Sequence, residues 1–365
     1  MDKSNEKKKI LTIIRIVMVV GLAVFLGISW YLQSQKNKIP DLSFEETLQY
    51  TTKNDSDAVI TIGIIRDGTA SYKVYGENGK ELPHEAHVYE IGSLTKTFTA
   101  ALVRQAIEEG KLDIDDAIDK YLDVPAGKDY PTIRELVTHT SGYREHYFEF
   151  PMILNHLKGG NDFCGITKGM ILKKAGKKQQ NKGVYGFTYS NFGYAVLGLV
   201  LEKVYGNDMT VLLNSFAGDQ LSLKNTGISD STGDLGKYWQ WKEGDAYLSA
   251  GGLVSDIEDM LSYAGIQLGD DGVFSYCHLP LREIGATPAE YDALGVRMDE
   301  IGMSWVIDDR NGIIWHNGGT GHYNCYMGFI PEKDIAVVVL SNLSPNRRIP
   351  ATVLGAKLLL ELSGS

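Results

Sequence analysis

The sequence predicts an α+β fold, with one antiparallel sheet flanked by N- and C-terminal helices and a mostly helical subdomain. Two β-rich runs lie near the start of the chain and four lie near its end, while residues from about 113 to 262 have helix and loop patterns. Strands and helices at both ends of a helical middle predict that the first and last segments share one sheet.

The first elements have local sequence signals. A helix over Ser43–Thr52 begins with Ser43 as N-cap and Glu46 three residues later, which is the capping-box pattern. The β-rich runs Val59–Arg66 and Ala70–Tyr75 are separated by Asp67-Gly68-Thr69, and this spacing predicts a hairpin.

The later elements are predicted from changes in the spacing of apolar residues along the chain. A helical pattern runs from Thr95 to Glu109 and ends at Gly110, and an apolar helix is predicted over Ala195–Val204. The β signals that return afterwards are Gly302–Ile307, Gly312–His316, Tyr323–Ile330 and Asp334–Leu340, and a last helix is predicted from about Ile349 to Leu362.

Composition excludes several classes of protein. The chain has 365 residues, 43% of them apolar and 22% charged, which is typical of globular proteins rather than disordered or fibrous ones. Its formal charge of −10 argues against nucleic acid as a partner, because polyanion binding depends on clustered basic residues. Cys164, Cys277 and Cys325 lie far apart, without the spacing of a zinc site, so we expect no metal and no cofactor.

The N-terminus predicts attachment to a membrane. Residues 1–9 read as a cytoplasmic tail that ends in three consecutive lysines, and residues 10–32 form an apolar run long enough to cross a bilayer. A cleaved secretory signal is the alternative, but no small-residue cleavage site follows the run. The sequence therefore predicts a single-pass signal-anchor helix, a tether over residues 33–42, and a domain over residues 43–365 outside the cytoplasm.

Ser93-Leu94-Thr95-Lys96 opens the helix that follows the first hairpin. The free N–H groups of a helix start favour developing negative charge, and Lys96 lies three residues on, within reach of the Ser93 hydroxyl. A partly desolvated lysine can take the proton of a serine and turn it into a nucleophile. The alternative is an ordinary N-cap serine, and Ser4-Asn5-Glu6-Lys7 shows that the pattern also occurs by accident.

Two further motifs could complete a site. Tyr189-Ser190-Asn191 lies on a predicted loop before an apolar helix, where a tyrosine could relay a proton and an asparagine amide could hold a carbonyl. His316-Asn317-Gly318-Gly319 ends a β run, and its glycines would let a substrate backbone approach closely. The alternatives are a packed tyrosine with a capping asparagine, and a glycine-rich turn. Lys242-Glu243-Gly244 is a rival for the third motif.

Taken in order, these motifs resemble the serine β-lactamase and penicillin-binding-protein superfamily. The chain is most similar to its class C β-lactamase-related branch, which includes D,D-peptidases, D-aminopeptidases and esterases. The segments that carry the resemblance are residues 89–96, 109–116, 132–142, 248–255 and 328–342. The resemblance implies a β-lactamase/transpeptidase-like fold and covers the chain from about Leu42 to the C-terminus.

The resemblance also implies roles for single residues. Ser93 would be the acylated nucleophile, Lys96 its proton partner and Tyr189 the acid/base relay, with the choice of general base between Lys96 and Tyr189 left open. His139, in the Thr-His-Thr-Ser-Gly stretch, is interpreted as structural and left out of the site.

The remaining carried-over residues would bind substrate. Asn191 would contact both the substrate and Lys96. His316 and Asn317 would lie where relatives have other side chains, followed by Gly318 and Gly319. The N–H groups of Gly319 and Ser93 would form an oxyanion hole. Many relatives have lysine at the position of His316. Since histidine is only partly cationic near neutral pH, we expect β-lactam hydrolysis to be slow or absent.

The function implied is that of an extracytoplasmic serine hydrolase working through an acyl-enzyme. Its substrate would be a small molecule or a piece of cell wall, with an amide or ester such as a D-amino-acid peptide or a D-alanyl ester. A non-catalytic wall-binding or β-lactam-sensing module and a true class C β-lactamase are the alternatives. A lysine-rich segment over residues 158–182 suggests a basic rim that attracts anionic substrates, or else a solvated helix face.

Overall fold

The computed structural model describes residues 40, 42–178, 185–269 and 272–364. The chain divides into two units, Met1–Asp41 and Leu42–Ser365, and the fold below is that of the second. Among the helices in the described ranges, none is long and apolar enough to cross a bilayer. The predicted tail and anchor, and nearly all of the tether, lie outside the described residues.

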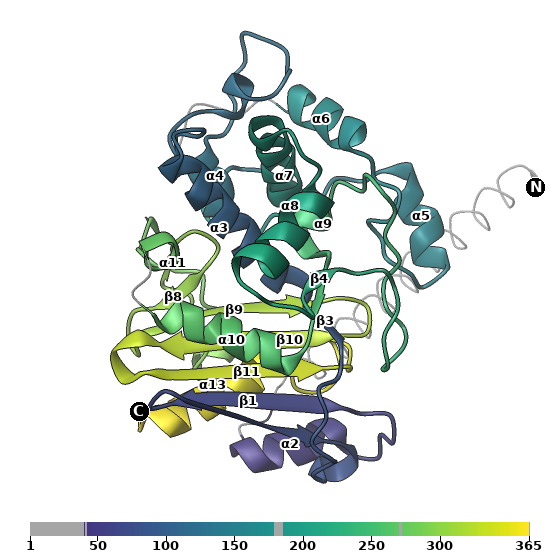
Figure 1. Cartoon of the computed structure of the whole chain (residues 1–365), viewed down its shortest axis with the longest axis vertical. Helices are drawn as coiled ribbons and strands as arrows, with labels where there is room; N and C mark the ends of the chain where they lie inside the picture. The colour runs from purple at the N-terminus through teal and green to yellow at the C-terminus, as the bar shows by residue number, and fades with distance from the viewer. Residues whose placement is uncertain (1–39, 41, 179–184, 270–271, 365) are drawn as a thin grey trace, which may run out of the picture. The chain divides into compact units, whose positions relative to one another are not determined.

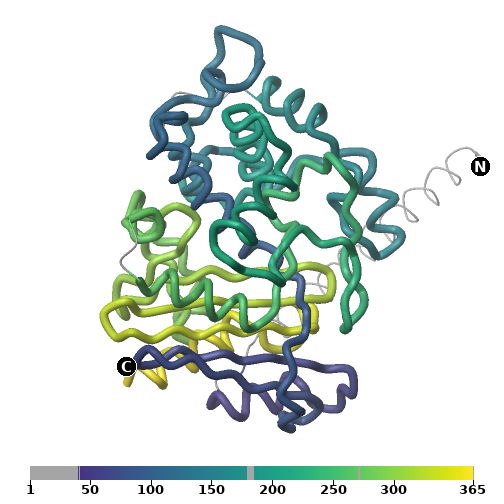
Figure 2. Tube along the Cα trace, in the orientation of Figure 1, coloured from purple at the N-terminus to yellow at the C-terminus, as the bar shows by residue number. Residues whose placement is uncertain are grey.

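An eight-stranded antiparallel sheet forms one half of the unit. Its order is β2-β1-β11-β10-β9-β8-β7-β6. The strands are β1 Ile60–Arg66, β2 Thr69–Tyr75, β6 Arg282–Glu283, β7 Glu300–Ile301, β8 Val306–Asp308, β9 Ile313–Gly319, β10 Asn324–Ile330 and β11 Ile335–Ser341. β1 pairs with β11 from Ile60↔Ser341 to Arg66↔Ile335, so the first and last segments do share one sheet, as Figure 2 shows.

Helices cover both faces of this sheet. α13 (Ala351–Ser363) packs on β10 and β11 behind the sheet, with α2 (Phe44–Thr52) beside it, and α10 (Ile257–Leu268) crosses in front (Figure 1). Because both faces are covered, β10 and β11 are buried at every residue instead of alternating between buried and exposed positions.

The helical subdomain lies beside the sheet (Figure 1). It contains α3 Thr95–Glu108, α4 Ile133–Val137, α5 Phe150–Leu157, α6 Lys168–Lys177, α7 Asn191–Tyr205, α8 Met209–Ser215 and α9 Leu248–Gly251. α3 and α7 pack against each other at its centre. Phe98 of α3 stacks on Tyr263 of α10 with ring centroids 4.1 Å apart, which ties the subdomain to the helix over the sheet.

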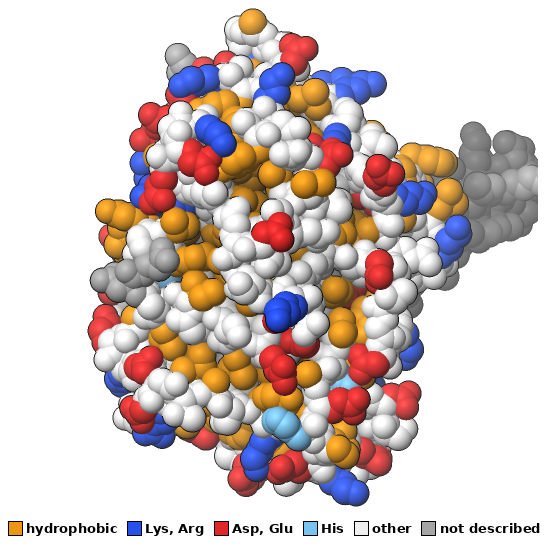
Figure 3. Space-filling model, viewed as in Figure 1, with side chains coloured by type: hydrophobic (Ala, Val, Ile, Leu, Met, Phe, Trp, Pro, Cys, Tyr) orange, Lys and Arg blue, Asp and Glu red, His pale blue; other side chains and the backbone are white. Residues whose placement is uncertain are grey.

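The remaining elements are short. A small sheet of order β3-β5-β4 joins Tyr89–Glu90, Leu253–Ser255 and Gly227–Ile228, and α11 (Gly272–Cys277) and α12 (Ala289–Asp292) lie between α10 and β7. On the face that Figure 3 shows, acidic and basic side chains are interspersed, without an extended basic patch of the kind that polyanions require.

Most expected elements are confirmed. Ser43 caps α2 with Glu46 in a capping box, and the hairpin turns at Asp67 and Gly68, whose φ angles are 50° and 71°. The prediction of one strand over Gly302–Ile307 was wrong. β7 ends at Ile301 and β8 begins at Val306, because the chain reverses between them in a turn where Ser304 has a φ of 73°.

Candidate active site

Ser93 lies where the helical subdomain meets the sheet. The chain leaves β3, makes the 3-10 turn η2 (Gly92–Leu94) and enters α3. The turn touches the end of β9, because a Cβ atom at Gly92 would lie only 2.7 Å from the backbone nitrogen of Gly319, and one at Gly318 would lie 2.0 Å from the carbonyl oxygen of Ile91. Glycine at these positions therefore brings the predicted nucleophile and the edge of β9 together.

Lys96 holds the Ser93 hydroxyl. Its Nζ atom donates hydrogen bonds to Ser93 Oγ at 2.9 Å and to the carbonyl oxygen of Ala250 at 2.6 Å. The lysine is fully buried, and burial lowers the pKa of its amine well below the usual value, although the charge of Glu145 acts in the opposite direction. A lysine with so low a pKa can lose its proton and act as a base near neutral pH.

The structure also rules out the alternative that Ser93 is an ordinary N-cap of α3. The N-cap of α3 is Leu94, which makes no side-chain capping bond, and Ser93 belongs to the preceding turn. The Ser93 hydroxyl is bonded to the amine of Lys96 instead.

Tyr189 completes a cluster with these two residues. The Ser93 side chain lies close enough to the Tyr189 hydroxyl to lower its pKa, and Lys96 Nζ lies 4.9 Å from the centre of the tyrosine ring. Burial raises the pKa of the Tyr189 hydroxyl above its usual value. The tyrosine therefore keeps its proton and is suited to donate it.

Among the described residues no hydrogen bond joins the Asn191 side chain to Lys96, and its contact with substrate stays a prediction. The prediction that it lies on the loop was wrong: α7 begins at Asn191 itself, since Ser190 Oγ accepts a hydrogen bond from the Gly193 amide and caps the helix one turn earlier than expected. Lys96 Nζ donates to Ser93 and Ala250, and Asn191 is not among the residues that line the cavity described below.

The third motif occupies the end of β9, as expected, but its histidine is not cationic. His316 is 3% exposed, and burial lowers its pKa to about 3. Its Nδ1–H donates to the carbonyl oxygen of Asn317 at 2.6 Å, which assigns the tautomer. The Asn317 amide donates to Thr352 Oγ1 at 2.8 Å and so fastens the end of β9 to α13.

A cavity of about 380 Å³ joins the three motifs. Ser93, Tyr189, His316 and Gly319 line one part of it, and Pro288, Val296 and Met298 are among the apolar residues of the rest. The volume lies in the range of about 300–1,000 Å³ that is typical of small-molecule sites. Neither Lys242 nor any lysine of the 158–178 stretch lines the cavity.

The lysine-rich segment is partly neutralised. Lys168 pairs with Glu202 and Asp208, and Lys174 pairs with Glu149 at 2.9 Å. Residues 179–184 of the segment lie outside the described residues, so the basic-rim hypothesis stays a prediction.

His139 is the residue that the sequence interpretation missed. It is buried, lines the cavity, and lies with its ring centre 4.5 Å from that of Tyr189. Thr188 N–H donates to the His139 carbonyl oxygen at 2.9 Å and Ser190 N–H donates to its Nδ1 at 3.0 Å. The imidazole is neutral, because burial lowers its pKa well below the usual value. The Thr-His-Thr-Ser-Gly stretch was the sequence feature that could have indicated that His139 belongs to the site.

No group of three or more metal-binding side chains is found in the described ranges, and Cys164, Cys277 and Cys325 are free thiols.

Comparison with known proteins gives consistent matches. The family described as Beta-lactamase matches residues 53–359. Protein flp of Staphylococcus aureus (strain MW2) is 22% identical over 280 residues, which are 70% of this chain and 53% of that protein, so the chain spans about half of its length. A beta-lactamase of Pseudomonas fluorescens is 23% identical over 345 residues, with 82% of this chain and 92% of that protein covered.

Solved structures share the fold. The crystal structure of a beta-lactamase/D-alanine carboxypeptidase from Yersinia pestis complexed with citrate superposes with a TM-score of 0.70 at 21% identity, covering 88% of this chain and 96% of that one. The octameric penicillin-binding protein homologue from Pyrococcus abyssi superposes with a TM-score of 0.69 at 22% identity, covering 88% and 76%.

Proposed function

Because the chain belongs to the beta-lactamase family of serine hydrolases, we propose that it cleaves an amide or ester, or transfers its acyl group, through an acyl-enzyme on Ser93. The observation that carries this proposal is the 2.9 Å hydrogen bond between Ser93 Oγ and the buried amine of Lys96. A serine hydroxyl is a weak nucleophile until an adjacent base takes its proton, and Lys96 is placed to do so.

The lowered pKa of Lys96 suits it to accept a proton, and the raised pKa of Tyr189 keeps that residue protonated as a donor. The neutral amine of Lys96 takes the proton of Ser93 as Oγ forms a bond to the substrate carbonyl carbon. When the tetrahedral intermediate collapses, the bond from that carbon to the leaving oxygen or nitrogen breaks, and Tyr189 gives the leaving group a proton that Lys96 replaces. Water, or an acceptor amine or alcohol, then takes the acyl group by the reverse sequence.

The negative charge of the intermediate would be held by backbone donors. The N–H groups of Ser93 and Gly319 belong to the two segments that Gly92 and Gly318 allow to touch. Donors fixed in this way stabilise an oxyanion without having to reorganise during the reaction.

The substrates that we propose are amides and esters such as a D-amino-acid peptide or a D-alanyl ester. A carboxylate lying against β9 would find no cation in His316, whose pKa is about 3. The site therefore favours substrates that present no carboxylate to that strand.

We also propose that residues 10–32 anchor the protein in the cell membrane with residues 43–365 on the extracytoplasmic side. The support is the length of the apolar run and the three lysines before it. Carbonate extraction of membranes and protease accessibility in intact cells test this. Release of the full-length chain by carbonate, or its protection from external protease, would contradict it.

Covalent labelling tests the chemistry. A fluorophosphonate probe should add to the protein and to Ser71→Ala, an exposed control, but not to Ser93→Ala. Intact mass after exposure to a panel of D-peptides and esters should show a transient acyl adduct on Ser93. Equal labelling of Ser93→Ala would overturn the assignment, and no labelling of the wild type would favour a non-catalytic binding module.

A further inference from the structure

One wall of the cavity beside Ser93 is apolar and comes from residues 287–306. We call this part of the cavity the apolar chamber. It is formed by Pro288, Tyr291, Val296, Met298, Ile301 and Val306. Trp315 of β9, which is 6% exposed, adjoins the chamber. Ser304, a buried serine of the same segment, also lines the cavity, so this wall is mostly rather than wholly apolar.

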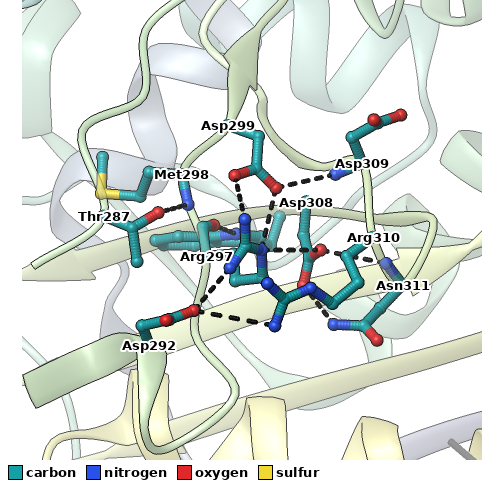
Figure 4. Close-up of polar contacts among 10 residues, drawn as sticks. Thr287, Asp292, Arg297, Met298, Asp299, Asp308, Asp309, Arg310 and Asn311 are labelled. Carbon is teal, nitrogen blue, oxygen red and sulfur yellow. Dashed lines mark hydrogen bonds and ion pairs between the residues drawn. The ribbon is translucent and has the colours of Figure 1, made fainter. Parts of the chain in front are cut away.

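A cluster of polar contacts holds the segment that carries this wall (Figure 4). The guanidinium of Arg297 donates hydrogen bonds to Asp299 at 2.6 and 3.0 Å and to Asp292 at 2.5 Å. The Met298 amide donates to Thr287 Oγ1 at 2.7 Å, and the Trp315 indole N–H donates to the carbonyl oxygen of Arg297 at 2.9 Å. Paired charges with a bidentate arginine fix a loop in one position, so the chamber is preformed.

No charged side chain faces the chamber. Among the described residues that line the cavity there is no Lys, Arg, Asp or Glu. Burial lowers the pKa of both His139 and His316, so these two lining histidines are neutral near pH 7. An ionised substituent placed here would lose its hydration without gaining an oppositely charged partner, whereas an apolar one would be removed from water.

We propose, on the basis of the acyl-serine activity above, that the apolar chamber binds an uncharged apolar substituent, an alkyl chain or aromatic ring, on one side of the scissile carbonyl. The continuity of the chamber with Ser93 and Tyr189 places that substituent directly beside the reacting atoms. On the side of the carbonyl that enters the chamber, a hydrophobic group is then preferred over a small or carboxylate-bearing one.

Binding without turnover tests the chamber independently of the reaction. With the full-length Ser93→Ala protein, calorimetry would measure dissociation constants for neutral N-alkyl acetamides from methyl to hexyl. Affinity should rise by up to about fourfold for each methylene group that the chamber buries. Adding Met298→Glu, which places a carboxylate in the chamber, should remove this dependence. Ala289→Glu, an exposed residue of the same segment outside the lining, is the matched control and should retain it.

Turnover by the wild type shows whether the acyl group or the leaving group of the substrate enters the chamber. Methyl heptanoate and hexyl acetate are isomers that differ only in which side of the carbonyl carries the chain, and the preferred one should exceed methyl acetate at least tenfold in kcat/KM. Equal affinity for all chain lengths in Ser93→Ala would overturn the proposal. An unchanged dependence of affinity on chain length after addition of Met298→Glu would also overturn it. Retained chain-length dependence in binding, with no Ser93-dependent turnover or labelling, would support the chamber and overturn the proposed function instead.

Discussion

At the scale of single residues, burial decides what each polar group of the site can do. Lys96 lies in the protein interior with its amine on Ser93 Oγ. Removing an ammonium group from water disfavours its charged form, and the same burial keeps Tyr189 protonated. One environment thus produces a base and an acid from two groups that are both protonated in water at neutral pH.

The pH dependence of acylation follows from Lys96. Because its pKa is lowered, the rate of fluorophosphonate labelling should rise with pH and reach a plateau below pH 10, the usual range for lysine titration. Lys96→Gln should lose the labelling, and Lys111→Gln, on the exposed C-terminal side of α3, should not. A rate that still rises through the normal lysine range would show that Lys96 is not the base.

His139 is expected to act as a positioning residue for Tyr189. It accepts hydrogen bonds from the amides on both sides of that tyrosine, with its own φ at 57°. His139→Ala should lower kcat about ten- to a hundredfold with little change in KM, because a small misplacement of a proton donor is costly. It should also cost about 1–3 kcal/mol of stability through the unpaired Ser190 amide.

His139→Asn is the conservative comparison. Asparagine tolerates a positive φ and offers an acceptor near the position of Nδ1, so stability and part of kcat should return. Steady-state kinetics and urea unfolding of both variants would measure this. Equal kcat losses in both variants, with stability restored by asparagine, would contradict a role in positioning the tyrosine.

At the scale of elements, sequence signals that act locally were sufficient for most of the fold. The capping box of α2, the turn at Asp67 and Gly68, and the strand that ends at Gly319 are each determined by a few neighbouring residues. The start of α7 was missed because two residue types compete there. Serine and asparagine are about equally good N-caps, and the hydrogen bond from the Gly193 amide to Ser190 Oγ shows that Ser190 takes this role, which places Asn191 in the helix.

What the sequence could not give is the surroundings of the site residues. The neutral state of His316 depends on its burial, which is produced by residues far from it in sequence. The apolar chamber depends on how residues 287–306 fold back over β9, and the hydrogen bonds of Arg297 that hold them have no linear pattern. Such features arise from tertiary packing, which periodicity does not encode.

The state of His316 at the end of β9 leads to a prediction about β-lactams. With a pKa of about 3, this histidine offers no positive charge to a β-lactam carboxylate at neutral pH. Hydrolysis of a chromogenic cephalosporin should therefore be slow or absent, while Ser93-dependent cleavage of neutral esters is retained. Absorbance assays with both substrates on one preparation compare them directly, and cephalosporin turnover matching that of a dedicated β-lactamase would refute the argument.

At the scale of the whole unit, Glu90 links distant parts of the chain. It lies on β3, is 3% exposed, and accepts hydrogen bonds from Thr320 Oγ1, just after β9, at 2.6 Å and from the Trp239 amide at 2.5 Å. Burial nevertheless raises its pKa to about 7, because the two bonds only partly offset the loss of hydration. The joint between the sheet and the segment around Trp239 therefore contains a carboxyl group that titrates near neutral pH.

This titration makes stability depend on pH in a defined direction. Between pH 4.5, where an unfolded glutamate ionises, and about 7, the folded chain holds a proton that the unfolded chain has released. The stabilisation is thus complete below pH 4.5 and is lost as pH rises through 7. Between pH 5 and 8 the free energy of unfolding should fall by about 2–3 kcal/mol more in the wild type than in Glu90→Gln. Urea unfolding at both pH values measures the difference, with the exposed Glu81→Gln as control. A difference that is unchanged or of opposite sign would show that Glu90 is ionised in the folded protein throughout this range.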